Sequence, residues 1–283
     1  MNAMKKSTCA FLIVLLLVAA LPSAALCGVL RTDITVTSRP ALGGGWDLTA
    51  VIENTGDAET YDLRAFLFVD GWAEVFSNLG DNPPGNALRL KARWAPERAL
   101  AGRYGGMVRL HFQEKSGRAH KAFHPFTLQL GEGPFPSNGL EVEVNTPAVH
   151  PRAFWRPSPR LEVRVENPHD KPVKAHVQVF LPEGITTPSP SVTRPVEPGA
   201  TVPVTFPLTL ARPLLREARF HVTAWYEHER VHRARYLKGR ITVEEGPVLI
   251  QVYVVGALIL LVVVFLVLFV RGKKTMLKEP GKG

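Results

Sequence analysis

The strongest constraint on the fold is an internal repeat with a constant offset of 113 residues. Glu53-Asn54 ends a run in which apolar and polar residues alternate, and Glu166-Asn167 ends a second run of the same kind. The same offset relates residues 132–134 to residues 245–247, both with the sequence Glu-Gly-Pro. One shift that matches early and late landmarks predicts two copies of one domain, formed by residues 28–134 and 138–246.

Each copy has the pattern of a strand-rich domain. Apolar residues recur at every second position within 61–69 and 173–179, which is typical of strands with one buried and one solvent-facing side. The last third of each copy, 107–130 and 220–243, is typical of a hairpin. About seven strands per copy favour an immunoglobulin-like sandwich. We therefore expect an all-β fold of two tandem immunoglobulin-like β-sandwich domains plus one C-terminal transmembrane helix.

The first 27 residues are typical of a secretory signal peptide. Lys5 and Lys6 precede an uncharged run, and small residues follow Pro22. Cleavage is expected after Ala25 or after Cys27, and a lipoprotein would instead carry its acyl chain on Cys27.

Residues 248–270 contain no charged side chain and, as a helix, span roughly 34 Å, enough to cross a bilayer. Arg271 and several lysines follow at once. This asymmetry predicts that residues 271–283 form a basic cytoplasmic tail and that the two domains lie outside the cytoplasm. The region between the two apolar segments holds 27 basic and 24 acidic residues, so a nucleic-acid partner is not indicated.

Residues 28–247 contain no cysteine and no Asn-x-Ser/Thr acceptor. Eukaryotic cell-surface domains of this size usually carry disulfides or glycans. We therefore expect a protein of a bacterial or archaeal cell membrane, with a single membrane-spanning helix.

The stretch "VRVENPHDKPVKAHVQVFLPEG", followed by "VEPGATVPVTFPLTL", resembles the NEW3 and CARDB-type immunoglobulin-like domains of bacteria and archaea. The stretch "VIENTGDAETYDLRAFLFVDG" of the first copy resembles the first half of that pattern. The resemblance implies a binding or spacer role and carries no catalytic residues.

The candidate partner-binding residues are Arg152, Phe154, Trp155 and Arg156, with Trp72 as a second position. Prolines stiffen the stretch around Trp155, so its aromatic and arginine side chains would lose little entropy on contact. The alternative is that Trp155 packs against its own domain.

His221, His228 and His232 lie in the last hairpin beside two glutamates, and this pattern fits either a zinc site or an ordinary polar face. We expect no metal and no cofactor. The sequence holds none of the nucleophile, phosphate-loop or zinc-protease motifs that would indicate an enzyme. We therefore expect a non-enzymatic scaffold or accessory subunit for a protein partner in the envelope. The alternative is a membrane-anchored glycan-binding module, with tryptophan stacking on sugars and arginines meeting an acidic polysaccharide.

Overall fold

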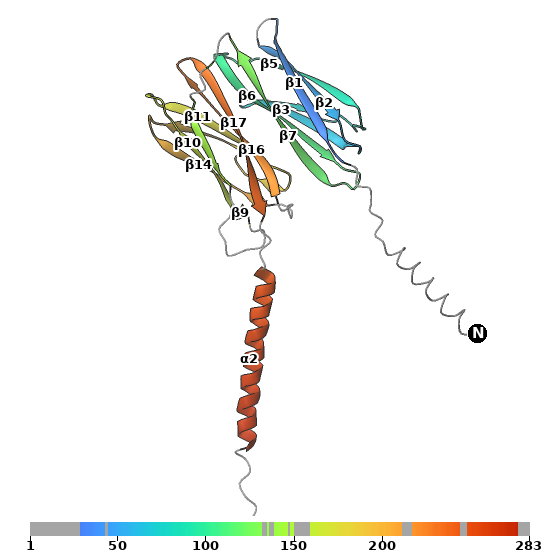
Figure 1. The fold of residues 1–283 in the computed structure, drawn as a ribbon, viewed down its shortest axis with the longest axis vertical. Helices are drawn as coiled ribbons and strands as arrows, with labels where there is room; N and C mark the ends of the chain where they lie inside the picture. The colour runs from blue at the N-terminus through green and yellow to red at the C-terminus, as the bar shows by residue number, and fades with distance from the viewer. Residues whose placement is uncertain are drawn as a thin grey trace, which may run out of the picture. The chain divides into compact units, whose positions relative to one another are not determined.

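A computed structural model describes residues 29–42, 45–131, 135, 139–146, 148–149, 159–210, 217–243 and 248–276. The chain forms two compact units. Unit 1 holds the described residues up to Ala99 together with Gly106–Phe126, and unit 2 holds Leu100–Gly105 and the described residues from Thr127 onward. Strands dominate both units (Figure 1), which confirms the expected predominance of β-structure. The predicted signal peptide and residues 132–134, where the first predicted domain ends, lie outside the described residues.

Unit 1 contains a three-stranded sheet with the order β1–β2–β5 and the run β4–β3–β6–β7 of a larger sheet. Their strands are β1 (Thr32–Pro40), β2 (Trp46–Asn54), β3 (Tyr61–Val69), β4 (Trp72–Phe76), β5 (Ala87–Trp94), β6 (Ala101–Gln113) and β7 (Ala119–Leu130). Residues 101–105 of β6 and residues 127–130 of β7 belong to unit 2. Buried side chains alternate along the strands, as in Leu48, Ala50 and Ile52 of β2. Each sheet therefore buries one face and leaves the other outward.

Unit 2 repeats this strand order. One sheet has the order β8–β10–β14, and the other runs β13–β11–β16–β17. The strands are β8 (Glu141–Asn145), β9 (Ala148–Val149), β10 (Arg160–Glu166), β11 (Val173–Phe180), β12 (Ile185–Thr186), β13 (Ser191–Val196), β14 (Thr201–Pro207), β15 (Thr209–Leu210), β16 (Glu217–His228) and β17 (Val231–Val243). Strand β12 pairs with β15. Strand β17 also pairs in parallel with β9 and with the first residues of β6.

The two expected hairpins are present. Strands β6 and β7 are neighbours and enclose the turn at residues 114–118. Strands β16 and β17 pair along their whole length. Their turn lies at Glu229 and Arg230, whose φ angles are 52° and 62°. The left-handed backbone at these two residues therefore closes the second hairpin.

One buried asparagine organises the same turn in both units. Asn54 Nδ2 donates to the carbonyl oxygens of Ala58 and Asn82, each at 2.8 Å. Asn167 Nδ2 donates to those of Lys171 and Val196, at 2.8 Å and 3.0 Å. In each case the Oδ1 atom accepts from the backbone N–H two residues later. Both side chains are fully buried, and their bonds to the carbonyls of Asn82 and Val196 lie in the buried interior, where they satisfy backbone groups away from water.

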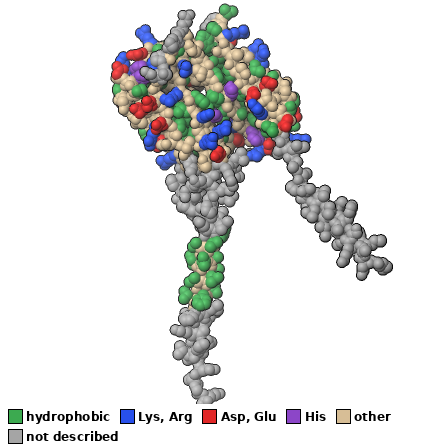
Figure 2. All heavy atoms as spheres, in the orientation of Figure 1, with side chains coloured by type: hydrophobic (Ala, Val, Ile, Leu, Met, Phe, Trp, Pro, Cys, Tyr) green, Lys and Arg blue, Asp and Glu red, His purple; other side chains and the backbone are tan. Residues whose placement is uncertain are grey.

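Helix α2 (Val248–Met276) is 29 residues long. Its side chains are described for residues 253–267, all of which are exposed, and hydrophobic side chains cover this stretch (Figure 2). In the part of the chain that the structure describes, no helical stretch is both long enough and apolar enough to count as a membrane span.

Candidate functional site

The candidate site lies on the outward side of the second sheet of unit 1. Along β3, Leu63, Ala65, Leu67 and Val69 are buried, so Phe66 and Phe68, which alternate with them, face outward and stay partly exposed. Arg109 of β6 lies across from Phe66 in the strand register. We call Phe66, Phe68, Arg109 and the neighbouring His111 the β3–β6 face.

Arg109 stacks on both phenylalanines. Its guanidinium carbon lies 4.3 Å from the ring centroid of Phe66 and 5.0 Å from that of Phe68. The two rings are 6.5 Å apart and nearly parallel, so they form one aromatic support for the cation. Burial lowers the pKa of Arg109, yet this group stays protonated at physiological pH.

The charge of Arg109 is not matched by an acid in the part of the chain that the structure describes. Its Nε atom is buried and has no hydrogen-bond partner there. A guanidinium offers five donors in a planar fork that suits carboxylates. Because two rings hold this fork in place, the β3–β6 face can recognise a carboxylate at a small entropic cost.

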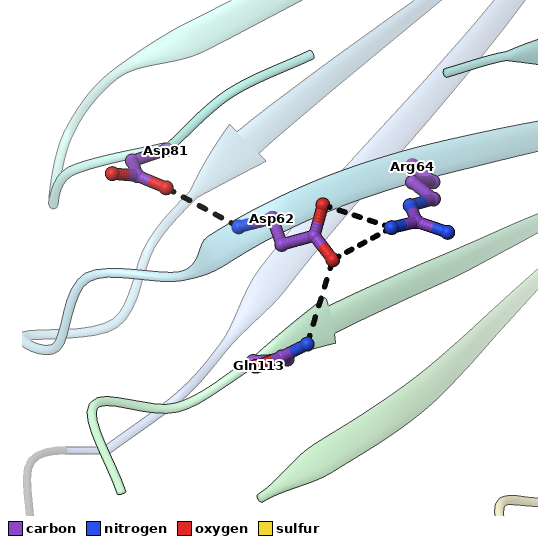
Figure 3. Close-up of polar contacts among 4 residues, drawn as sticks. All are labelled: Asp62, Arg64, Asp81 and Gln113. Carbon is purple, nitrogen blue, oxygen red and sulfur yellow. Dashed lines mark hydrogen bonds and ion pairs between the residues drawn. The ribbon is translucent and has the colours of Figure 1, made fainter. Parts of the chain in front are cut away.

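Asp62, on the same face, is already engaged (Figure 3). Its carboxylate accepts from Arg64 Nη2 at 2.9 Å and 3.2 Å, and from Gln113 Nε2 at 3.4 Å. Its backbone N–H donates to Asp81 Oδ1 at 3.2 Å. Asp62 has a φ angle of 49° and lies in a register irregularity at the start of β3. This local acid is therefore committed to Arg64, and Arg109 keeps its positive charge available.

Strand β4 borders the β3–β6 face. The turn before it contains Asp70 and Gly71, with φ angles of 40° and 87°, as a two-residue hairpin of type I′ requires. Among the described strands, β4 pairs with β3 alone. Val75 lies across from Phe66 and is 56% exposed. Strand β4 therefore presents an open edge and an exposed apolar side chain beside the aromatic support.

Of the candidate partner-binding residues that the sequence indicated, the structure describes Trp72 alone. Trp72 lies at the start of β4, across from the buried Val69, and is itself partly buried. Arg152, Phe154, Trp155 and Arg156 lie outside the described residues. Phe66, Phe68 and Arg109 are not among the candidate residues that the sequence indicated. The alternation along 61–69 was the available signal for the two phenylalanines, because it assigns them to the outward side.

The three histidines of the last hairpin do not converge. His221 contacts the hydroxyl of Tyr236, His228 stacks on His169 with ring centroids 4.0 Å apart, and His232 stacks on Tyr104 at 3.8 Å. Among the described residues, no three potential ligands lie close enough to hold a metal ion. Burial is the main cause that lowers the pKa of His221, to about 4, with help from two nearby cations. Its ring is therefore neutral at physiological pH.

Comparison with known proteins gives no family. No family model matches the chain, and no curated protein matches it. Among solved structures, red sea bream transglutaminase is 14% identical with a TM-score of 0.25, and the match covers 77% of this chain and 32% of that one.

Escherichia coli alpha-2-macroglobulin activated by porcine elastase is 12% identical with a TM-score of 0.31, over 78% of this chain and 23% of that one. Salmonella alpha-2-macroglobulin reacted with methylamine is 11% identical with a TM-score of 0.29, over 76% and 16%. This chain thus spans a third or less of the length of these proteins, and the low TM-scores carry no argument about its fold or function.

Proposed function

We propose that this chain is a membrane-anchored, non-catalytic accessory protein of a bacterial or archaeal envelope. Its two immunoglobulin-like sandwiches would lie outside the cytoplasm, and unit 1 would bind a protein partner along β4 and the adjoining β3–β6 face. The observation that carries this proposal is the open edge of β4, with Val75 exposed beside the stacked Arg109.

The edge of β4 differs from the other sheet edges. Natural sheets protect their edges with prolines and charges, because an unprotected edge pairs with other strands. Six other described strands of five or more residues pair on one side only, and they follow this rule: Arg39 and Pro40 in β1, three basic residues in β5, Glu141 and Glu143 in β8, Arg194 and Pro195 in β13, two prolines in β14, and Lys121 and Pro125 in β7. Strand β4 has no proline and a single charge, Glu74. It is therefore the edge best suited to receive a partner strand.

The neighbouring cation adds selectivity. A strand added beside β4 would place alternate side chains on the same side as Val75 and Ala73, which lie next to the β3–β6 face. An acidic side chain of the partner could then meet Arg109, which lacks an acid of its own among the described residues. Main-chain hydrogen bonds would supply affinity, and the carboxylate–guanidinium pair would supply specificity.

The anchor rests on α2. Residues 248–270 carry no charge, Arg271, Lys273 and Lys274 follow, and the described apolar side chains of 253–267 are all exposed. An apolar surface of this kind on a helix needs a cover, and lipid is the cover that fits an all-round apolar helix. The basic residues that follow favour a cytoplasmic C-terminus.

A glycan-binding role for Trp72 or Trp155 is the alternative. Trp72 lies on the core side of β4, across from Val69, and so offers less of its ring than a sugar platform would need. We therefore prefer the protein partner.

Site-specific photocrosslinking tests the partner surface. A photoreactive residue replaces Val75 in the full-length chain, expressed in its own host, and a second version carries it at Arg194 on the edge of β13. We expect a discrete adduct with another protein from position 75 and none from position 194. In the same cells, Arg109→Gln should reduce the adduct from position 75 several-fold, because the partner carboxylate loses its donor.

Equal adducts from both positions, or none from position 75, would reject the β4 surface. Thermal unfolding serves as the control for both substitutions. Val75 is exposed, so its replacement should change the stability by less than about 0.5 kcal/mol.

Alkaline extraction tests the anchor separately. The full chain should stay with the membrane pellet at high pH, while a chain that ends at residue 247 should be released. Release of the full chain would reject the anchor without bearing on the β4 surface.

A further inference from the structure

The other outward face of unit 1, on the sheet β1–β2–β5, has a different chemistry. Leu48, Ala50 and Ile52 of β2 are buried, so the residues between them point outward. The strand register aligns the outward side chains in cross-strand rows: Arg39–Asp47–Arg93, Thr37–Thr49–Lys91, and Thr35–Val51–Arg89. We call these three rows the basic rows.

The surface formed by the basic rows contains a shallow depression. An open depression of about 300 Å³ is lined by Arg39, Asp47, Thr49, Lys91 and Arg93, with Leu48 and Ala92 contributing to its wall. Arg93 Nη2 donates to the carbonyl oxygen of Leu42 at 2.8 Å, which holds the guanidinium at the rim. The surface is therefore a shallow trough rather than a deep pocket, and it suits part of an extended molecule.

Positive charge prevails in this trough. The basic rows contain four cations and one acid, Asp47. Asp47 lies 3.9 Å from Arg39, with side-chain exposures of 44% and 80%, so water screens their attraction. The acids Asp33 and Glu53 form the row beside that of Arg89, at the end of the sheet away from Arg93. The basic rows thus form a local cationic surface on a domain of nearly balanced charge.

The arrangement of polar groups narrows the class of ligand. Arg89, Lys91 and Arg93 alternate along one strand, about 6.8 Å apart, and so form a straight ladder of charges. The hydroxyls of Thr35, Thr37 and Thr49 lie in the rows beside it. None of the outward side chains of these described strands is aromatic, so the face lacks the stacking platform that single-stranded nucleic acids use. It also lacks the apolar anchors typical of protein interfaces, apart from Val51.

We propose that the basic rows bind a linear acidic polysaccharide. Its carboxylates would pair with Arg89, Lys91 and Arg93, and its hydroxyls would hydrogen-bond to Thr37 and Thr49. This site uses the opposite sheet of unit 1 from the β4 surface and does not depend on the proposed protein partner.

The test measures binding of the full chain, held in nanodiscs of neutral lipid, to polygalacturonate. Fully methyl-esterified polygalacturonate is the matched neutral polymer, and phosphatidylglycerol vesicles are the lipid probe. We expect binding to polygalacturonate alone, with an affinity that falls steeply as the salt concentration rises from 0.05 M to 0.5 M.

The double variant Arg89→Gln/Lys91→Gln should weaken this binding about tenfold, since exposed ion pairs contribute modestly and two are lost. Lys115→Gln/Arg118→Gln, at the exposed hairpin tip, makes the same change in net charge and should leave binding within about twofold. All four positions are exposed, so the melting temperature should stay unchanged for both variants.

Three results would each overturn the inference: equal binding of the esterified polymer, equal loss in the two double variants, or binding of vesicles in place of the polysaccharide. The second result would show that net charge alone, and not the basic rows, holds the polymer. None of these results bears on crosslinking from position 75.

Discussion

The two units of this chain share one buried framework, the asparagine turn, but differ in the residues at a neighbouring sheet edge. Asn54 in unit 1 and Asn167 in unit 2 donate to two backbone carbonyls each and accept from the backbone N–H two residues later. At the neighbouring sheet edge, unit 1 has Val75 exposed on β4, whereas unit 2 has Arg194 and Pro195 on β13. The comparison shows that both units keep the buried turn, whereas the chemistry of the neighbouring edge differs between them.

A second comparison shows how the framework tolerates change. In unit 1, Gly106 of β6 lies under the ring of Phe126 of β7; in unit 2, Phe220 of β16 covers Gly239 of β17. The glycine and the phenylalanine have exchanged strands. The sandwich therefore requires the volume of one ring at this place in the hairpin, and either strand can supply it.

The largest expected effect comes from breaking the shared turn. Asn54→Ala and Asn167→Ala should each lower the free energy of unfolding of their own unit by about 3 kcal/mol, because each removes three hydrogen bonds that join the turn to the backbone, one of them in the buried interior. Denaturant titration with segment-resolved hydrogen exchange would assign the loss to a unit. Asn145→Ala, at an exposed position in β8 away from both turns, is the control and should cost less than about 1 kcal/mol. A difference of more than about 1.5 kcal/mol between the two units would contradict an equivalent framework.

A smaller effect tests the exchanged pair. A Cβ atom at Gly239 would lie 2.2 Å from Phe220 Cζ, and one at Gly106 would lie 2.1 Å from Phe126 Cζ. Phe220 is fully buried and has no room to move, whereas Phe126 is partly exposed. Gly239→Ala should therefore cost about 2–3 kcal/mol and Gly106→Ala about 1 kcal/mol. Chemical denaturation measures both, and Phe220→Leu combined with Gly239→Ala should recover part of the loss. The reverse order of the two costs would refute the explanation by burial.

The smallest expected effect is a difference between the two units in how their stability depends on pH. The pKa of His221 is lowered to about 4 in the fold, so the unfolded chain takes up its proton first, near the ordinary pKa of 6.5. The contribution of neutral His221 to the free energy of unfolding is therefore fully present above pH 6.5. It is lost as the pH falls from 6.5 to about 4, and it does not change further below that pH. Burial lowers the pKa of His169 and His176 in the same unit as well.

Burial lowers the pKa of one histidine of unit 1, His124, in the same direction. Because three such histidines lie in unit 2, unit 2 should lose more stability than unit 1 between pH 7 and pH 5. His221→Gln should flatten that dependence, measured as hydrogen-exchange protection of β16 and β17 at several pH values. The carboxylates are unchanged in this variant, so the difference from the natural chain reports His221 alone. An identical pH dependence in the two proteins would show that His221 is not the group responsible.

Parts of the candidate site could be predicted from the sequence. The alternation over 61–69 places Phe66 and Phe68 on the outward side, and the Asp70-Gly71 pair indicates the turn before β4. The stacking of Arg109 on these rings could not be predicted, because it depends on the register between β3 and β6, which are far apart in the chain. The zinc hypothesis also depended on packing: His221 and His228 lie an odd number of residues apart on one strand and so face opposite sides of the sheet.

The sequence by itself determined the strand-rich fold, the two hairpins and the repeated asparagine turn, because alternation and turn chemistry are local properties. The tertiary structure alone decided which strands lie at an edge, which arginine lies over the two phenylalanines, and where four cations gather on β1 and β5. These features arise from pairing between distant strands. A shift of one residue in that pairing would turn every outward side chain of a strand toward the core.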